Sequence, residues 1–339
     1  MSEYIVVSRD RAGIELDEFL CLLFPEWNKG FVRRQVRSGR VLVDGEAANP
    51  SQFLRADQVL IVDIDEDEAP SPPRATPGAL LPVLYEDADV LVVDKPAGLA
   101  VEPERWAREK GSVAGSLLQL ARERSPGGKG DGGQGGIDMR PRLVHRLDKD
   151  TTGALLVAKD LGAERALRAA FEGGDVEKRY LALVEGEHPL PDGKQGLIDL
   201  PLGPDARRSG AMRVVEGGKP SRTRIDVVER FRGFTLLGCE PLTGRTHQIR
   251  VHLAARGFPL IVDGLYGRRD RLLLSEIKAG YRAKRGRPER PLIGRLTLHA
   301  ARLEFPSPST PGGRIRVEAP PPKDFALAVK NLSKYRTPR

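Results

Sequence analysis

The sequence predicts an α+β protein whose larger part is built on a largely antiparallel mixed β-sheet with flanking helices. The 339 residues exceed the length of one typical domain, so two parts are expected. Beyond residue 82, short apolar runs alternate with turns, and strand patterns outnumber helical patterns. The runs follow one another at hairpin-like spacings more often than in strand–helix alternation, which favours α+β over a doubly wound sheet.

A small α/β unit is expected over residues 14–64. Its first helix is predicted by apolar residues at helical spacing, which are Leu16, Phe19, Leu20 and Leu23. A second helix is predicted between Asn28, a good N-cap residue, and Gly39, which suits the position after a helix end. Strands at 41–43 and 59–62 complete the unit, and an Asp-Gly turn follows the first of them.

The second predicted helix carries a basic stripe. Arg33, Arg37 and Arg40 are spaced i, i+4 and i+7, which places them on one face of a helix. Such a stripe is often only a solvated surface. It would also suit a polyanionic partner.

The larger part follows a linker. Residues 65–81 are acidic and then rich in proline, which predicts an extended interdomain segment. Strands are predicted near 82–85, 90–94, 154–158, 177–184, 222–230 and 234–239, and helices near 113–123, 161–171 and 246–255. Residues 127–136 are Gly-rich and are interpreted as an insertion, and residues 326–339 are expected to form a basic C-terminal tail.

Positive charge is concentrated in one segment. The formal net charge is +8, and residues 268–290 contain nine Lys or Arg against three acids. This clustering favours a polyanionic partner, and the alternative is a solvated basic loop.

The two cysteines and the apolar runs exclude several classes. Cys21 and Cys239 are far apart and have apolar neighbours, which argues against a disulfide framework and a cysteine-rich zinc site. The N-terminus lacks the pattern of a signal peptide, and no apolar run is long enough to span a bilayer. A cytoplasmic protein without membrane contact is expected.

The segment His145–Gly153, HRLDKDTTG, places Asp148 in a loop between two predicted strands. A loop held by a sheet is a frequent position for catalytic residues. An Asp beside Thr and Gly can equally serve its own turn. Both interpretations are open on this segment alone.

Several catalytic classes lack their patterns. His247 and His252 are five residues apart, a spacing that separates them by about 140° on a helix, so they would not easily share a metal. The chain has no His-Glu-x-x-His, no Gly-x-Ser-x-Gly and no phosphate-binding glycine loop. No metal and no cofactor are expected.

Five segments, in order, resemble the RluA-type pseudouridine synthases. They are YEDADVLVVDKPAG from Tyr85, HRLDKDTTG from His145, EKRYLAL from Glu177, TGRTHQIRVHL from Thr243 and LHA from Leu298. Residues 14–64 resemble the αL RNA-binding domain. The resemblance spans roughly residues 14–325 and implies a catalytic domain at 82–325 with an RNA-binding cleft, in the bacterial branch that modifies large-subunit ribosomal RNA.

The resemblance implies roles for three residues. Asp148 would be the aspartate that attacks the target uridine while the N-glycosidic bond breaks, before the uracil reattaches through C5. Arg250 would face this carboxylate, and a helix capped by Thr246 would hold it one turn in. Tyr180 would stack on the base and is a candidate for removing the C5 proton.

Other residues are assigned to RNA. The resemblance implies that Arg146 enters the RNA stack when the uridine is flipped out. Lys95 is expected to shape the cleft and is counted with the RNA-binding residues, which also include Arg33 and Arg37. His145, Arg245 and His247 are expected to position RNA or to support the fold. The expected partner is structured RNA, ribosomal in the first place with transfer RNA as the alternative, and a monomer without cofactor is expected.

Two rival functions are considered. A non-catalytic RNA-binding or ribosome-assembly protein on the same fold would be expected to lack the aspartate, the arginine or the tyrosine, and all three are present. A base glycosylase would release free uracil instead of reattaching it.

Overall fold

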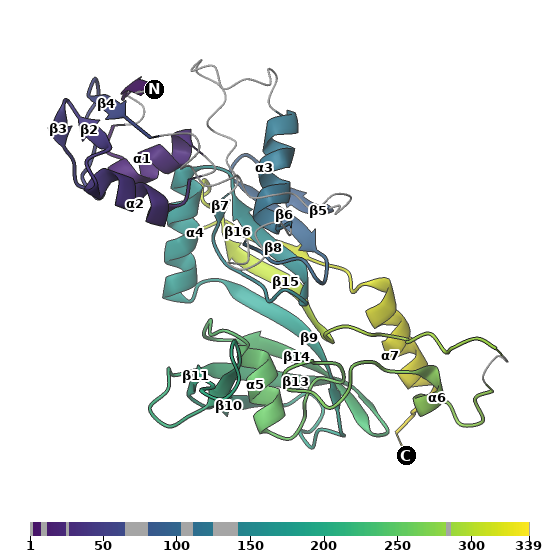
Figure 1. Cartoon of the computed structure of the whole chain (residues 1–339). Coiled ribbons are helices and arrows are strands. Elements are labelled where there is room, and N and C mark those ends of the chain that lie inside the picture. The colour runs from purple at the N-terminus through teal and green to yellow at the C-terminus, as the bar shows by residue number, and fades with distance from the viewer. Residues whose placement is uncertain are drawn as a thin grey trace. The chain divides into compact units, whose positions relative to one another are not determined.

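The computed structural model describes residues 3–7, 12–24, 27–64, 81–102, 111–124, 142–282 and 286–338 (Figure 1). They belong to two compact units, which we call the N-terminal unit (Met1–Pro77 with Glu102–Pro141) and the sheet unit (Gly78–Val101 with Arg142–Arg339). The Gly-rich stretch at 127–136 and residues 65–80 of the predicted linker lie outside the described residues.

The N-terminal unit contains an antiparallel sheet and two helices that share one core. Its elements are β1 (Glu3–Val6), α1 (Leu16–Leu23), α2 (Lys29–Arg37), β2 (Val41–Val43), β3 (Glu46–Ala47) and β4 (Val59–Val62). The described strands lie in the order β1-β4-β2-β3. The two predicted helices and two predicted strands are confirmed, whereas β1 was not predicted. Helix α3 (Val113–Arg124), also predicted, falls within the same unit.

Helix α2 begins and ends where the sequence predicts. The Asn28 side chain accepts a hydrogen bond from the backbone N–H of Phe31 at 2.9 Å, and Gly39 has a φ of 77°. The buried face of α2 is formed by Phe31, Val32 and Val36. Arg37 therefore lies on the exposed side of the helix.

The sheet unit is organised around one large mixed sheet. Its strands are β5 (Val83–Glu86), β6 (Val90–Lys95), β7 (Arg142–Leu143), β8 (Thr152–Ala158), β9 (Glu177–Glu185), β10 (Gln195–Asp199), β13 (Arg222–Phe231), β14 (Phe234–Pro241), β15 (Leu298–Pro306) and β16 (Arg314–Glu318). In the described residues the order is β10-β13-β14-β9-β15-β8-β6-β5, with β16 beside β15 and β7 beside β8. Among the strand pairs of this sheet that the structure describes, only β15 and β8 are parallel. The predicted fold class and all six strands predicted in this part are confirmed.

Shorter elements complete the sheet unit. A two-stranded hairpin is formed by β11 (Leu202–Pro204) and β12 (Met212–Val214). The helices are α4 (Leu161–Gly173), α5 (Gln248–Ala255), α6 (Leu274–Ile277) and α7 (Lys323–Tyr335), of which α4 and α5 were predicted. No helix in the described ranges has the length and apolar character needed to cross a bilayer.

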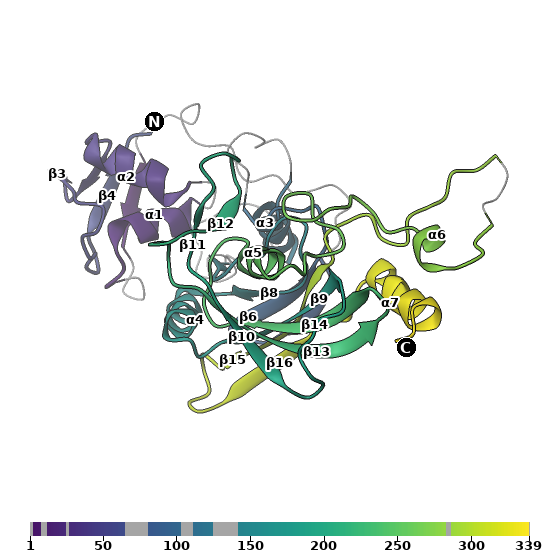
Figure 2. The same ribbon diagram turned by 90° about the horizontal axis from the view of Figure 1, so that it is seen from below.

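Strand β9 separates two cores because its side chains alternate between the faces of the sheet. Ala182 and Val184 share a core with Ile249 of α5, whereas Leu183 belongs to the core that contains α7. Figure 2 shows α5 beside the strands that it covers. Tyr180, two residues before Ala182, packs against the α5 core and therefore lies on the same face as α5.

The basic tail expected at 326–339 is corrected by the structure. Most of this segment belongs to α7, which anchors the chain end to the sheet unit. The buried residues of α7 are Phe325, Ala328 and Leu332, spaced i, i+3 and i+7. This apolar stripe is narrow, and polar residues surround it, so the segment looks like a charged tail in the sequence.

Candidate active site

Asp148 lies in the connection between β7 and β8, as the sequence predicts. The backbone around it forms a turn, in which the N–H of Thr151 donates to the carbonyl of Asp148 at 3.1 Å. The carboxylate is not used in that turn. Its Oδ2 accepts a hydrogen bond from Nη1 of Arg250, 102 residues later, at 3.0 Å. The described contacts therefore favour the interpretation of Asp148 as a site residue over that of a turn-stabilising acid.

Gly153 fixes the start of β8 close to β15. Its φ is 113°, and a Cβ added there would lie 2.2 Å from the carbonyl oxygen of Ala300, with which it pairs. A side chain cannot be placed at this distance, so the close approach of the two strands requires glycine. The loop that carries Asp148 ends at this tight contact.

Lys95, at the end of β6, fixes the other side of the loop. Its ammonium group is fully buried and donates to the carbonyls of Pro96 (2.9 Å), Leu99 (2.8 Å) and Lys149 (2.7 Å). Burial lowers the pKa of Lys95 to about 8, although the negative charges of Asp150 and Asp148 oppose the shift. All three donors are used inside the protein. The RNA contact expected for Lys95 is therefore corrected to a structural role, which ties the residue after Asp148 to the end of β6.

Arg250, the third residue of α5, joins two carboxylates that are distant in sequence. Its Nε and Nη2 donate to Oδ2 and Oδ1 of Asp263, both at 2.8 Å, and its Nη1 donates to Asp148. The side chains of Arg250 and Asp263 are only 8% and 1% exposed. The expected contact between Arg250 and Asp148 is thus present in the structure, and the fork of the guanidinium serves both acids at once.

Asp263 was missed by the sequence analysis. Burial opposes its ionisation, but hydrogen bonds from Arg250 and from the backbone N–H groups of Leu265 and Tyr266 hold the pKa of Asp263 below its usual value. Burial likewise opposes the charge on Arg250, and the two carboxylates raise the Arg250 pKa. A signal was present, because Asp263 ends the apolar run LIVD and a buried arginine needs acid partners.

His247 lies beside Asp148 in an unusual backbone conformation. Its φ of 55° places it in the left-handed region, and it occupies the N-cap position of α5, where the sequence predicted Thr246. Its Nε2 is 4.0 Å from Oδ2 of Asp148, and its Nδ1 is 2.8 Å from the hydroxyl of Tyr266. Burial lowers the pKa of His247, so the imidazole is neutral near pH 7.

Tyr266 is a second residue that the sequence analysis missed. Its hydroxyl accepts a hydrogen bond from the backbone N–H of Met212 at 2.7 Å, and the Arg250 guanidinium lies 5.1 Å from the centre of its ring. Burial raises the pKa of Tyr266. Only a Tyr three residues after Asp263 was visible in the sequence, and a lone aromatic residue is usually core.

Tyr180 lies on β9, on the face of the sheet that α5 covers, and is half-buried. Burial raises its pKa well above the usual range, and the negative charge of Asp148 adds to the shift. The phenol is therefore protonated at neutral pH.

The remaining predicted site residues of the sheet unit differ in exposure. Arg146 and Arg245 are exposed, as expected for RNA contacts. His145 is not suited to that role, because its Nε2 accepts a hydrogen bond from the backbone N–H of Leu156 at 2.8 Å and its ring stacks on Phe171. Burial lowers the pKa of His145 to about 3. Of the two roles expected for His145, these contacts favour support of the fold over an RNA contact.

The two arginines of the basic stripe that were assigned to RNA, Arg33 and Arg37, differ in whether an acid neutralises their charge. Nε of Arg33 donates to Asp17 of α1 at 2.7 Å, and the Asp17 side chain is fully buried. Arg37 is exposed. Of the two stripe residues assigned to RNA, Arg37 has the more available charge.

Metal ligands are not gathered anywhere in the ranges that the structure describes, where no group of three or more His, Cys, Asp and Glu could hold an ion. His247 and His252 do not converge. Nδ1 of His252 lies 2.9 Å from the hydroxyl of Thr223, and its Nε2 lies 3.0 Å from the carbonyl oxygen of Leu200. The chemistry that this site offers is that of an oriented carboxylate, a fixed cation and a phenol.

Comparison with known proteins gives the family. The RNA pseudouridylate synthase model matches residues 89–255, and the S4 domain model matches residues 16–60. Ribosomal large subunit pseudouridine synthase D of Xanthomonas campestris is 38% identical over 330 residues, which cover 96% of this chain and 91% of that protein. Ribosomal large subunit pseudouridine synthase C of Escherichia coli is 36% identical over 347 residues, covering 98% and 97%. The chain belongs to the RNA pseudouridylate synthase family.

A solved structure supports the fold of this pseudouridylate synthase. Human RNA pseudouridylate synthase domain containing 1 is 26% identical, with a TM-score of 0.51, and the match covers 77% of this chain and 97% of that one. The family match at 89–255 contains Asp148, Tyr180 and Arg250, and ends before Asp263 and Tyr266. The structure thus brings into the site two residues that lie beyond the matched segment.

Proposed function

We propose that this synthase converts specific uridines to pseudouridine in large-subunit ribosomal RNA, with Asp148 as the nucleophile. The observation that carries the proposal is the Asp148 carboxylate bound by Arg250, which Asp263 fixes in turn. The choice of RNA is supported by the two relatives described above, whose names state the ribosomal large subunit.

The proposed reaction is balanced without a cofactor. An oxygen of Asp148 bonds to the uridine, at sugar C1′ or base C6, while the bond between C1′ and N1 breaks. The uracil turns, C5 bonds to C1′ and the carboxylate is released. One proton leaves C5 and one is gained at N1, so the product has the atoms and electrons of the substrate. An ionised carboxylate is the required nucleophile, and Arg250 faces it with a fixed positive charge.

Tyr180 is proposed to stack on the flipped uracil. Its half-buried ring lies on the face of the sheet that α5 covers, and its protonated phenol adds no charge to the base site. Removal of the C5 proton by Tyr180 would need the phenolate. Bonding of Asp148 to the substrate removes its negative charge, and with it one of the two causes that raise the Tyr180 pKa.

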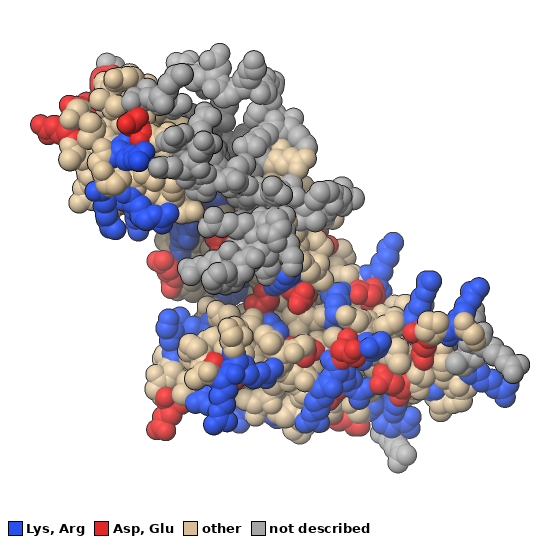
Figure 3. All heavy atoms as spheres, viewed as in Figure 1, with Lys and Arg blue, Asp and Glu red and all other residues tan. Residues whose placement is uncertain are grey.

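Asp148, Arg250 and Asp263 are called the acid cluster below. RNA binding is proposed to use exposed cations outside this cluster. Arg146 is two residues from Asp148 and exposed, so it could replace a flipped base in the stack, which offsets an unstacking cost of a few kcal/mol. In the basic segment 268–290, Arg269 and Arg271 form ion pairs with acids, whereas Arg282 and Arg287 are exposed. Figure 3 shows Lys and Arg side chains projecting from the end of the sheet unit that carries α6 and α7. These cations would contact phosphates without reading sequence.

The proposal is tested by mapping pseudouridine across ribosomal and transfer RNA in a strain that lacks the protein. We expect one or more sites in large-subunit ribosomal RNA to revert to uridine and to be restored by the wild type but not by Asp148→Asn. Loss of sites in transfer RNA alone would contradict the substrate, and an unchanged map would contradict the activity.

A further inference from the structure

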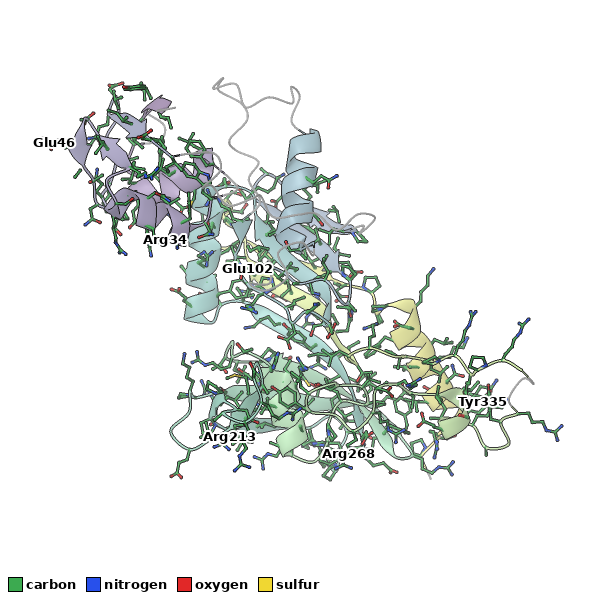
Figure 4. The ribbon with its side chains drawn as sticks, in the orientation of Figure 1. Arg34, Glu46, Glu102, Arg213, Arg268 and Tyr335 are labelled. Carbon is green, nitrogen blue, oxygen red and sulfur yellow. The ribbon has the colours of Figure 1, made fainter. Side chains whose placement is uncertain are left out.

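The pair of His247 and Tyr266 contacts the acid cluster but has no part in the chemistry above. Three polar groups form a series of contacts that ends at the nucleophile. The backbone N–H of Met212 donates to the Tyr266 hydroxyl at 2.7 Å, this hydroxyl lies 2.8 Å from Nδ1 of His247, and Nε2 of His247 lies 4.0 Å from Oδ2 of Asp148. Strand β12, which supplies Met212 and the neighbouring Arg213 labelled in Figure 4, packs against α5.

These contacts favour one tautomer of His247. The Tyr266 hydroxyl already accepts the Met212 N–H, so its own proton is available for Nδ1. A neutral imidazole that accepts at Nδ1 carries its proton on Nε2, the atom that faces Asp148. The other tautomer would leave the Tyr266 proton without an acceptor in the described part of the chain, and would turn the Nε2 lone pair toward a carboxylate.

The two nitrogens that face Asp148 approach the same carboxylate oxygen. Nη1 of Arg250 lies 3.0 Å and Nε2 of His247 lies 4.0 Å from Oδ2. No hydrogen bond reaches Oδ1 from any residue that the structure describes, and the side chain is 21% exposed. The contact at 4.0 Å is too long for a hydrogen bond, and such contacts often tighten only when substrate is bound.

We propose that His247, held in its Nε2–H form by Tyr266, is a positioning residue that acts with Arg250 to confine Oδ2 of Asp148 and leave Oδ1 as the attacking oxygen. The inference rests on the proposed function and names the oxygen that performs it. A neutral donor orients the carboxylate without adding a second full positive charge, which would weaken the nucleophile. The charges that act on His247 are Arg250 and Arg146, which favour the neutral form, and Asp148 and Asp263, which oppose it.

The backbone at His247 accepts more than one type of side chain. Its φ of 55° lies in the left-handed region, where Asn, Asp and His are several-fold more frequent than other residues with a side chain. If the position served only to start α5, asparagine would suit it at least as well as histidine. This difference supplies a discriminating pair of variants.

The test compares His247→Gln with His247→Asn in the full chain. The amide nitrogen of Gln can take the place of Nε2, whereas the shorter Asn tolerates the backbone better but cannot reach Asp148. We expect kcat for pseudouridine formation to fall about tenfold in His247→Asn, because one hydrogen bond is lost, and less than about threefold in His247→Gln. KM should be unchanged in both variants. The reverse order, Asn above Gln, would show a backbone role and overturn the proposal.

A second measurement does not depend on turnover. The chain contains five histidines, so ¹⁵N-histidine labelling of the full protein gives five imidazole signal sets, and His247→Gln assigns one of them. We expect the Nε2–H tautomer for His247 in the wild type and its loss in Tyr266→Phe, with kcat lowered about tenfold. An Nδ1–H tautomer in the wild type overturns the proposal even if the enzyme is active. Absence of pseudouridine formation in the wild type overturns the proposed function instead.

Tyr335→Phe is the matched control. Tyr335 lies at the end of α7, at the other end of the sheet unit from β12 (Figure 4). This variant removes a phenol hydroxyl without touching the acid cluster, so the His247 signals and kcat should remain as in the wild type. A similar loss of kcat in both Phe variants would contradict a specific role for Tyr266.

Discussion

Replacing Asp263 by Asn tests whether the buried acid holds Arg250 for catalysis. Asp263 is 1% exposed at its side chain and accepts four hydrogen bonds, two from Arg250 and two from backbone N–H groups. The Asn amide retains one acceptor oxygen and turns an NH₂ group toward a donor. The variant thus loses the charge and the bond to one of the two Arg250 nitrogens.

The expected loss of stability follows from these contacts. A hydrogen bond to a charged group contributes about 1.5 to 3 kcal/mol, and breaking a buried ion pair costs about 3 to 5 kcal/mol. Because Asn can keep part of the network, we expect the free energy of unfolding to fall by about 3 kcal/mol. Arg250 is then held by Asp148 and by one remaining hydrogen bond to the introduced amide, and its displacement by about 1 Å would lower kcat about 10- to 100-fold.

Two assays check this prediction. Urea denaturation gives the free energy of unfolding, and release of tritium from RNA labelled at uridine C5 gives kcat, because the reaction removes that hydrogen. Asp324→Asn is the matched control, since Asp324 also binds an arginine, Arg295, through both oxygens, but is 39% exposed at its side chain. The control should lose about 1 kcal/mol or less and keep full activity. If Asp263→Asn kept kcat within twofold of the wild type, Asp263 would not position Arg250.

Three further predictions concern other contacts. Asp148→Asn should abolish pseudouridine formation and leave RNA affinity intact, and turnover within tenfold of the wild type would refute the nucleophile. Lys95 has a folded pKa of about 8, below the usual lysine value of 10.5. Between these pH values the unfolded chain binds more protons than the folded chain, so Lys95 raises the free energy of unfolding as pH increases. The wild type should therefore gain about 3 kcal/mol over Lys95→Met between pH 8 and 10.5 in urea denaturation, and parallel pH curves would contradict the lowered pKa of Lys95. Arg37→Gln should lower the slope of log affinity against log salt by about one phosphate contact without changing kcat at saturating RNA, whereas an unchanged slope would remove Arg37 from the RNA surface.

Local patterns predicted the sheet because they report burial of nearby residues. The apolar runs at 177–184, 222–230 and 234–239 became β9, β13 and β14 with ends within two residues. Strand β15 and helix α7 were missed, because polar residues interrupt the apolar positions of both and neither shows a sustained period.

The site was predictable only in part, since its contacts join residues far apart in the chain. Asp148 and Arg250 were paired through the family resemblance, and their spacing alone did not indicate contact. Asp263 and Tyr266 reach the cluster because the chain turns after α5 and returns beside it. A periodic pattern in the sequence does not indicate such a return of the chain. Lys95 and His145 were counted with the RNA-binding residues from their place in the family motifs, whereas their hydrogen-bond partners are backbone groups that the sequence does not identify.

The charge of the acid cluster separates catalysis from RNA affinity. Asp148 and Asp263 as carboxylates and Arg250 as a cation give the cluster one net negative charge, which repels phosphates, and the neutral His247 beside it adds none. Under the proposed function we therefore expect RNA affinity to come from exposed cations outside the cluster, such as Arg146 on the loop of Asp148 and Arg37 on the N-terminal unit. Within the cluster, the arginine fork is used for geometry, because two of its nitrogens are bound to Asp263 and a third is left for Asp148. A lysine would carry the same charge but could not be fixed by one acid while it orients the other.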